Sequence, residues 1–296
     1  MRFPLHGVLG AIAMLVSQIG MLRQVEPFWS WHTPIAWTGY ILFIDAWVYS
    51  RSGRSWLTAA RAEFVFLAAI SVPLWLIFEW FNLFIRNWHY INLPENLVLR
   101  YFGYAWSFAT IWPAIFETGE LVSSFRGSDH HPPQPAGAEP ARIGSRSTRL
   151  PLTPVAWLSV AAGLAMLLWP ILWPSRYLAA PVWLGFIFLL DPLNARAGGE
   201  SLAGDIRAAG GFWPGLMGRG ANLAVAGLIC GVLWEFWNFW ARTKWIYDVP
   251  ILPQLKLFEM PVLGYGGFPA FALECFTMYV TARLLFWRGA ARPISL

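Results

Sequence analysis

The sequence predicts an all-α integral membrane protein with about eight transmembrane helices, built from two tandem parallel four-helix repeats. Hydrophobic residues make up 57% of the chain and charged residues only 12%, whereas a soluble domain has about 25% charged residues. Apolar stretches long enough to cross a bilayer recur along the chain. The two halves also carry the same residues in the same order, and an internal repeat constrains the fold more than any local pattern does.

The apolar stretches define the expected spans. They cover residues 5–22, 33–50, 64–85, 98–122, 154–174, 177–193, 220–241 and 261–287. Met1–Leu22 has one charged residue at its start and no cleavage site of small residues, so we expect it to stay as the first span. Asp45 and Asp191 are expected at the cytoplasmic ends of the second and sixth spans. There each could pair with the arginine that follows, Arg51 or Arg196, or join the glutamates of the spans if its helix is tilted.

The repeat is visible in separate blocks. Residues 37–45 read Trp-Thr-Gly-Tyr-Ile-Leu-Phe-Ile-Asp, and residues 183–191 read Trp-Leu-Gly-Phe-Ile-Phe-Leu-Leu-Asp. Further matches lie 156 positions apart: Glu79 with Glu235, Asn82 with Asn238, Arg86 with Arg242, and Pro113 with Pro269.

These matches divide the chain. We expect a first four-helix repeat at 1–122, a cytoplasmic Pro/Gly/Ser-rich linker at 123–153 and a second four-helix repeat at 154–296. An even number of spans in each repeat means that both enter the membrane from the same side. Their symmetry axis should then lie along the membrane normal.

The placement of arginine and lysine predicts the orientation. With eight spans, fourteen of these residues lie on the side that holds both termini and the linker, and seven lie on the other side. The positive-inside rule then places both termini in the cytoplasm and the protein in the inner (cytoplasmic) membrane. The net charge of +5 reflects this asymmetry. We expect no nucleic-acid partner, because the chain has no basic run or nucleic-acid motif.

Four glutamates in the expected spans are the candidate catalytic residues. They are Glu79, Glu117, Glu235 and Glu274. An ionisable side chain at such depth is costly unless it is paired, hydrated or neutral, and a neutral carboxyl is the form that a general acid needs. Asn82 and Asn238 follow Glu79 and Glu235 by three positions, so each could hydrogen-bond that carboxyl. The alternative is that these Glu–Asn pairs only tie the two halves together.

The same spans supply an expected binding site. The segment from Pro261 to Pro269 contains three glycines, which favours a bent or unwound span. Irregular backbone at membrane depth is tolerated only against protein or a cavity, although close helix packing is the alternative. The chain has 20 tryptophans, and those inside spans could line a large apolar ligand or a helix interface. The expected substrate-binding residues are Asn82, Asn238, Trp75, Trp80, Trp234, Trp237, Tyr265 and Phe268.

The loops after the third and seventh spans also match each other. One reads Asn87-Trp88-His89-Tyr90 and the other reads Lys244-Trp245-Ile246-Tyr247. Tryptophan and tyrosine favour the membrane–water interface. We therefore expect short extended or amphipathic segments that lie on the outer surface as lids.

We expect no cofactor and no metal. Cys230 and Cys275 lie in expected spans without metal-ligand spacing, and His130-His131 in the linker lack a third ligand. The chain has no phosphate-binding loop and no histidine placed for haem ligation. Both lysines, Lys244 and Lys256, lie outside the spans, which excludes a retinal Schiff base.

Three sequence elements recur in order in each half. In the second half they are Asp191 with Arg196, Trp234-Glu235, and Gly267-Phe268-Pro269-Ala-Phe-Ala-Leu-Glu274. In the first half they are Asp45 with Arg51, Phe78-Glu79, and Pro113-Ala-Ile-Phe-Glu117. This order resembles the lycopene cyclase domain family of bacterial and archaeal integral membrane proteins, which have two homologous halves. The chain departs from the family pattern in its lone Glu274 and in its four spans per half.

The resemblance implies a cofactor-independent isomerisation. In such a reaction a carboxylic acid protonates a terminal alkene of a linear carotenoid, the cation cyclises, and a carboxylate removes a proton. The four glutamates would then form the acid–base set.

Three functions are compatible with these features. The first is an intramembrane enzyme of cyclase, isomerase or hydratase type that acts on a long isoprenoid such as a carotenoid. The second is a non-catalytic pigment- or lipid-binding subunit of a larger membrane complex. The third is a proton-coupled transporter with a site between the repeats. The expected partners are a hydrophobic isoprenoid or lipid ligand and, for the second function, other proteins of the complex.

Overall fold

Long helices dominate the structure. The computed structural model describes residues 3–126, 150–287, 289, 292 and 294. The helices are α1 (Leu5–Leu22), α2 (Phe28–Ser52), α3 (Trp56–Ala59), α4 (Arg61–Ile85), α5 (Leu97–Ala109), α6 (Ile111–Phe125), α7 (Pro154–Leu172), α8 (Ala179–Ala197), α9 (Leu202–Ala208), α10 (Phe212–Gly215), α11 (Ala221–Trp240) and α12 (Gly267–Phe286). A π-helical turn, η3 (Leu216–Gly220), precedes α11, and a 3-10 turn, η4 (Val262–Gly266), precedes α12. The strands are β1 (Trp88–Ile91), β2 (Lys244–Tyr247), β3 (Lys256–Leu257) and β4 (Met260–Pro261).

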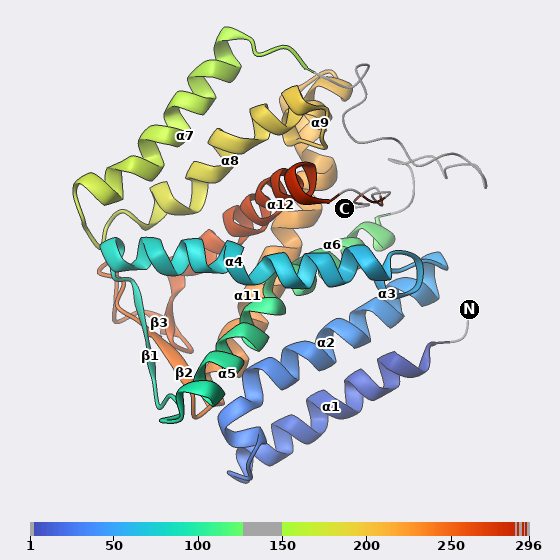
Figure 1. The fold of residues 1–296 in the computed structure, drawn as a ribbon, viewed down its shortest axis with the longest axis vertical. Coiled ribbons are helices and arrows are strands. Elements are labelled where there is room, and N and C mark those ends of the chain that lie inside the picture. Colours follow the sequence, from blue (N-terminus) through green and yellow to red (C-terminus); the bar gives the residue numbers. More distant parts are fainter. Residues whose placement is uncertain (1–2, 127–149, 288, 290–291, 293, 295–296) are drawn as a thin grey trace.

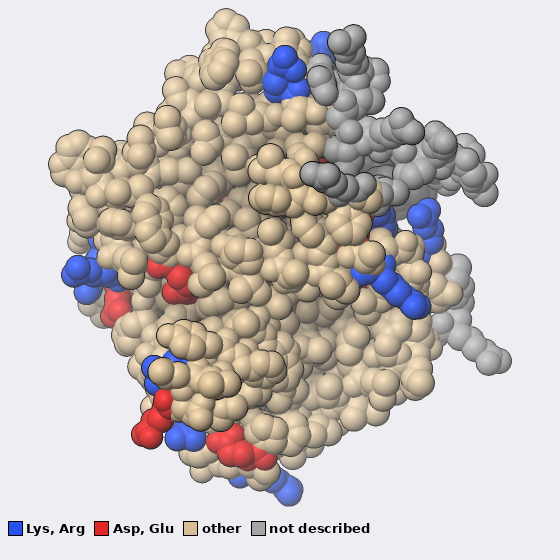
Figure 2. Space-filling view, in the orientation of Figure 1, with Lys and Arg blue, Asp and Glu red and all other residues tan. Residues whose placement is uncertain are grey.

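The helices confirm the expectation of a multi-pass membrane protein at a coarse level. Within the described part of the chain, four helical segments are long and apolar enough to cross a membrane: α1, α4, α7 and the run Phe212–Trp240. Figure 2 shows one face on which charged side chains gather near the strands and near the opposite end, with a broad uncharged surface between them. An uncharged band between two charged ends is the surface that a bilayer requires.

Two helical hairpins form opposite flanks of the molecule (Figure 1). One is α1 with α2, and the other is α7 with α8. In both, glycine lets the two backbones touch: a Cβ on Gly10 would lie 2.4 Å from the Gly39 carbonyl oxygen, and a Cβ on Gly163 would lie 2.7 Å from the Gly185 carbonyl oxygen. Small residues at helix crossings are typical of membrane proteins, where close packing replaces the hydrophobic effect.

Helices α4, α6, α11 and α12 lie between the hairpins (Figure 1). Helix α2 packs on α6, α8 packs on α12, and α11 packs on both α6 and α12. Aromatic side chains fill the contacts between distant parts of the chain. Phe78 of α4 stacks on Trp183 of α8 with ring centroids 5.0 Å apart. The buried Trp112 of α6 donates its indole N–H to the carbonyl of Cys275 in α12 at 2.9 Å.

Strands β1 and β2 lie at one end of the molecule, and α3 and α9 lie at the other (Figure 1). The two strands pair antiparallel, with His89 opposite Ile246. Helices α3 and α9 are capped alike, because the carboxylate of Asp45 accepts from the Leu57 N–H at 2.9 Å and that of Asp191 from the Leu202 N–H at 2.7 Å. The expected pairing of these aspartates with Arg51 and Arg196 is therefore wrong. A backbone N–H at a helix start satisfies each carboxylate instead.

Several expected span boundaries are also wrong. The stretch 98–122 is divided at Thr110 into α5 and α6, and Pro113 lies in the first turn of α6. Pro269 likewise lies in the first turn of α12. A first turn suits proline because its missing N–H has no partner to lose there, so neither proline kinks a continuous helix. Helix α8 continues through Pro192 to Ala197. Residues 127–149 of the expected linker lie outside the described residues.

Candidate functional site

A cavity of about 560 Å³ lies beneath the β1–β2 pair, within the size range of small-molecule sites, about 300–1,000 Å³. Aromatic residues are prominent in its wall. They are Trp31, Trp37, Trp75, Trp88, Tyr90, Tyr104, Phe108, Tyr177, Trp183, Trp234, Trp245, Tyr247, Phe268 and Phe271. Exposed large hydrophobic side chains also line it, namely Leu99, Tyr177, Ile251 and Leu263, so the cavity reaches the apolar surface.

Glu79 lies behind one side of this wall. One carboxyl oxygen accepts three hydrogen bonds: from the indole of Trp75 at 2.8 Å, from the indole of Trp88 at 3.2 Å and from the phenol of Tyr90 at 2.5 Å. All three donors line the cavity. All three donors are neutral groups, and they converge on a single oxygen of the Glu79 carboxyl.

Glu235 lies behind the other side of the wall and is fully buried. Its Oε1 accepts one hydrogen bond, from the phenol of Tyr247 at 2.8 Å. The phenol oxygen of Tyr247 in turn accepts from the indole of Trp245 at 2.8 Å. The second carboxyl oxygen of Glu235 has no hydrogen-bond partner among the described residues. With a single donor and full burial, this environment suits the neutral acid.

Two asparagines hold β1 and β2, the lid strands, in place. Asn82 donates to the Trp88 carbonyl at 2.8 Å and accepts from the Asn87 N–H at 2.8 Å. Asn238 donates to the Trp245 carbonyl at 2.8 Å and accepts from the same residue's N–H at 2.9 Å. The expected hydrogen bond from each asparagine to the neighbouring glutamate is therefore wrong. The chain turns back at the helix end. The backbone N–H and C=O groups that are left unpaired there hydrogen-bond the side-chain amide of each asparagine.

Tyr90 and Tyr247 stay protonated in this site. Both phenols lie on the lid strands, outside the helices. Burial, together with the neighbouring carboxyl of Glu79, raises the pKa of Tyr90 well above its ordinary value. Burial and Glu235 do the same for the pKa of Tyr247. Each phenol therefore remains an O–H donor near neutral pH, placed between a carboxyl and the cavity.

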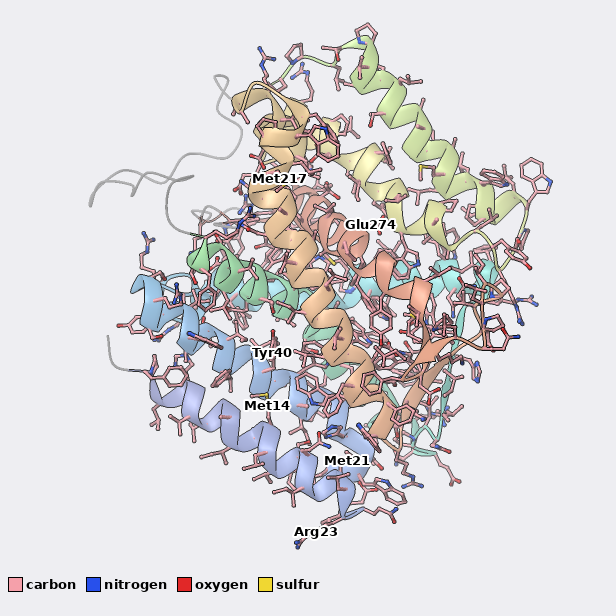
Figure 3. The ribbon with its side chains drawn as sticks, turned by 180° about the vertical axis from the view of Figure 1, so that it is seen from behind. Met14, Met21, Arg23, Tyr40, Met217 and Glu274 are labelled. Atoms are coloured by element: carbon pink, nitrogen blue, oxygen red, sulfur yellow. The ribbon has the colours of Figure 1, made fainter. Side chains whose placement is uncertain are left out.

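Glu117 and Glu274 lie elsewhere. Glu117 is fully buried on α6, with Asp45 and Glu120 as charged neighbours, and neither of its carboxyl oxygens has a hydrogen-bond donor among the described residues. Glu274 lies on α12 beside α8 (Figure 3), where one oxygen accepts from the Phe186 N–H at 3.1 Å. Neither residue lines the cavity, so the structure does not bring the four expected carboxyls together around one space.

The expected binding residues divide into two groups. Trp75, Trp234 and Phe268 line the cavity. The other five lie outside its wall: Asn82, Asn238, Trp80, Trp237 and Tyr265. Trp80 faces outward with 46% of its surface exposed. Trp237 packs on Trp37, with ring centroids 4.9 Å apart.

Tyr90 and Tyr247 are site residues that were not predicted from the sequence. The signal was present, because Trp-x-Tyr occurs in both lid segments, at Trp88 to Tyr90 and at Trp245 to Tyr247. We attributed these aromatic residues to the membrane interface, which accounts for their type but not for their matching spacing.

Among the described residues, no group of three histidine, cysteine or acidic side chains is arranged to hold a metal ion. Both cysteines are free and buried. Comparisons with protein families, curated proteins and solved structures found no match to this chain. The site must therefore be interpreted from its own geometry, and the resemblance to lycopene cyclases stays a hypothesis.

Proposed function

We propose that this protein is an intramembrane enzyme that binds a long isoprenoid in the aromatic cavity and rearranges it by acid–base chemistry. The observation that carries the proposal is the arrangement of Tyr90 and Tyr247. Each phenol lines the cavity and hydrogen-bonds a carboxyl, either the half-buried Glu79 or the buried Glu235. Two proton-transfer groups thus reach one apolar space from opposite halves of the chain.

The carboxyls of Glu235 and Glu79 differ in their number of hydrogen-bond donors, and we assign them as acid and base on this ground. Glu235, with one donor and an unpartnered oxygen, supplies the proton through Tyr247. Glu79, with three donors, is the carboxylate that takes a proton through Tyr90. Paired groups whose surroundings favour opposite protonation states are a common basis of acid–base catalysis.

The reaction is a redox-neutral isomerisation. The π electrons of a ligand alkene form a C–H bond with the phenolic proton of Tyr247, and Glu235 re-protonates the phenolate. A second alkene attacks the carbocation and closes a ring. Tyr90 takes a C–H proton while its own phenolic proton passes to Glu79, and a new alkene forms, so the product has the composition of the substrate. Proton exchange with solvent then returns Glu235 to the acid and Glu79 to the carboxylate. The tryptophan faces of the wall stabilise the cation on the way. This chemistry is the kind that the resemblance to lycopene cyclases implies.

We further propose that the chain comprises two homologous halves with four crossings each, related by a two-fold axis along the membrane normal. The matched glycine crossings, helix caps and Glu–Tyr contacts support this arrangement. The strand register supports it as well, because Trp88 pairs with Tyr247 and Tyr90 pairs with Trp245. The α3–α9 end would face the cytoplasm, as the arginine distribution predicts.

Deuterium transfer from solvent tests the enzyme proposal even while the substrate is unidentified. The purified protein would be incubated in D2O with an extract of membrane isoprenoids, and products would be analysed by mass spectrometry. We expect a subset of isoprenoids to gain deuterium. Glu235→Gln and Tyr247→Phe should each lower the rate by about 10²–10⁴-fold, the usual contribution of a general acid.

Tyr265→Phe is the matched control, because this phenol bonds the Leu257 carbonyl and does not line the cavity. Its rate should equal that of the wild type. Equal rates in the wild type, Glu235→Gln and Tyr247→Phe would contradict the proposal.

One observation favours a non-catalytic ligand-binding subunit as the second candidate. None of the four glutamates lines the cavity, so the Glu–Tyr bonds could serve only to hold the lid closed. A wild-type protein that retains an isoprenoid but transfers no deuterium to it would select this function.

The transporter is less well supported. The two halves are joined at one end by the β1–β2 pair and at the other by Arg283 with Glu63 at 3.3 Å and Arg292 with Glu120 at 2.9 Å. Rocking one half against the other would break one of these sets of contacts.

A further inference from the structure

The cavity wall contains positive charge that the protein does not neutralise. Three cationic residues line it: Arg100, Arg176 and Lys244. Lys244 is paired with Glu259 at 2.5 Å. Arg100 donates only to the Pro94 carbonyl, at 2.8 Å. Arg176 is exposed, and its side chain makes no hydrogen bond or ion pair among the described residues. The wall thus carries two arginines without a carboxylate.

Two buried polar atoms of the same wall also lack partners. Asn87 is 3% exposed, and its Oδ1 has no hydrogen bond among the described residues. Its amide nitrogen donates to the carbonyls of Ile85 and Arg176 at 3.0 Å each, which fixes the oxygen as the unpaired atom. The hydroxyl of Thr33, a residue 7% exposed, is unpaired as well. Buried polar atoms normally have partners, so a ligand that brings polar atoms to this wall would be favoured over a purely apolar one.

We propose that the ligand of this cavity is an isoprenoid whose chain ends in a phosphate monoester. The aromatic wall takes the chain, and Arg100 and Arg176 bind the anionic oxygens. A phosphate monoester carries a charge of about −1.5 to −2 at pH 7, so it matches two arginines, whereas an ionised carboxylate carries a single charge. Its oxygens can also accept a hydrogen bond from the Thr33 hydroxyl. The inference rests on the proposed function for the isoprenoid chain and adds the head group.

Ligand titration separates the head group from the chain. Tryptophan fluorescence of the full-length protein in detergent would be followed while geranylgeranyl phosphate or the neutral alcohol geranylgeraniol is added. We expect the phosphate to bind at least about tenfold more tightly, the usual size of one charge-assisted hydrogen bond. Arg176→Gln should remove most of that difference and leave the affinity for the alcohol unchanged. Inorganic phosphate at equal concentration should not displace the ester.

Arg23→Gln is the charge-matched control. Arg23 is exposed at the turn after α1 and projects away from the molecule (Figure 3). It should bind both ligands as the wild type does. Arg100→Gln gives a second, independent variant from another wall of the cavity and should act in the same direction as Arg176→Gln.

The outcomes separate the two proposals. If geranylgeraniol binds as tightly as the phosphate, or if Arg176→Gln and Arg23→Gln have the same effect, the head-group inference is overturned while deuterium transfer still decides the enzyme proposal. If inorganic phosphate displaces the ester, the arginines bind free phosphate and the inference is overturned as well. If neither isoprenoid quenches the fluorescence, the cavity does not take this class of ligand, and both proposals fail.

Discussion

Glu200 is held between two arginines where the two halves of the chain meet. It lies between α8 and α9 and pairs with Arg219 at 3.0 Å and with Arg283. Burial alone would raise the pKa of Glu200, but the two arginines outweigh burial and lower that pKa below its ordinary value. A lowered pKa means that the carboxylate stabilises the fold above the pKa of the unfolded chain, about 4.3. This stabilisation is lost as the pH falls through the folded-state value.

We therefore expect Glu200→Gln to destabilise the protein by about 1.5–3 kcal/mol at pH 7, the size of hydrogen bonds to charged groups. The difference from the wild type should shrink as the pH falls below about 4, because the wild-type carboxyl is then neutral as well. Thermal unfolding in detergent across this range measures both effects. Glu95→Gln, at an exposed position in the loop before α5, is the control. A difference that stays constant down to acid pH would contradict this assignment.

At the residue scale, the sequence predicted that Glu117, Glu235 and Glu274 are buried, but it missed the buried Glu63 and Glu120 and did not predict what these carboxyls contact. Glu79 and Glu235 were evident because charge is rare in apolar stretches. Their phenol partners were not, because Tyr90 and Tyr247 reach them only after the chain folds back over the helix end. The helical spacing rule that paired Asn82 with Glu79 failed for the same reason. It describes contacts along one helix and not those with the loop beyond it.

At the element scale, the lid strands depend on two asparagines. Asn238 makes both of its hydrogen bonds to the backbone of Trp245 in β2. Asn238→Leu keeps the side-chain volume but leaves that N–H and carbonyl without partners. We expect amide hydrogen exchange in 244–247 to accelerate by at least about tenfold, since an unsatisfied buried group costs about 1–3 kcal/mol. Exchange in α7, far along the chain, should not change. Unaltered exchange in β2 would show that strand pairing alone holds the lid.

The extended form of the lid segments could be predicted, and β1 and β2 confirm it. The apolar runs likewise predicted most of the long helices. Their ends were harder to predict, because hydropathy does not distinguish a helix from the turn that breaks it. Thr110 divides one expected span, and Asp191-Pro192 fails to end another, since α8 keeps its helical form through the proline.

At the scale of the whole molecule, the cavity depends on contacts that no local pattern specifies. Its wall combines β1 and α5 from the first half with α8, α11 and β2 from the second. The sequence predicted an apolar ligand near Trp75, Trp234 and Phe268, but the cross-pairing of the two lids sets where the cavity lies. Pairing between segments more than 150 residues apart is visible only in the folded chain.

The central claim is that this cavity holds an isoprenoid, and lipid analysis with a cavity-filling variant tests it most directly. Gly103 lines the cavity, and a Cβ placed there would meet no atom within 4 Å. Gly103→Trp should therefore fill the space without displacing backbone, whereas Gly103→Ala should leave the space open. Mass spectrometry of lipids extracted from the purified proteins should find an isoprenoid enriched over the membrane extract in the wild type and in Gly103→Ala, and lost from Gly103→Trp. Identical lipid profiles in all three proteins, with no enriched isoprenoid, would contradict the account.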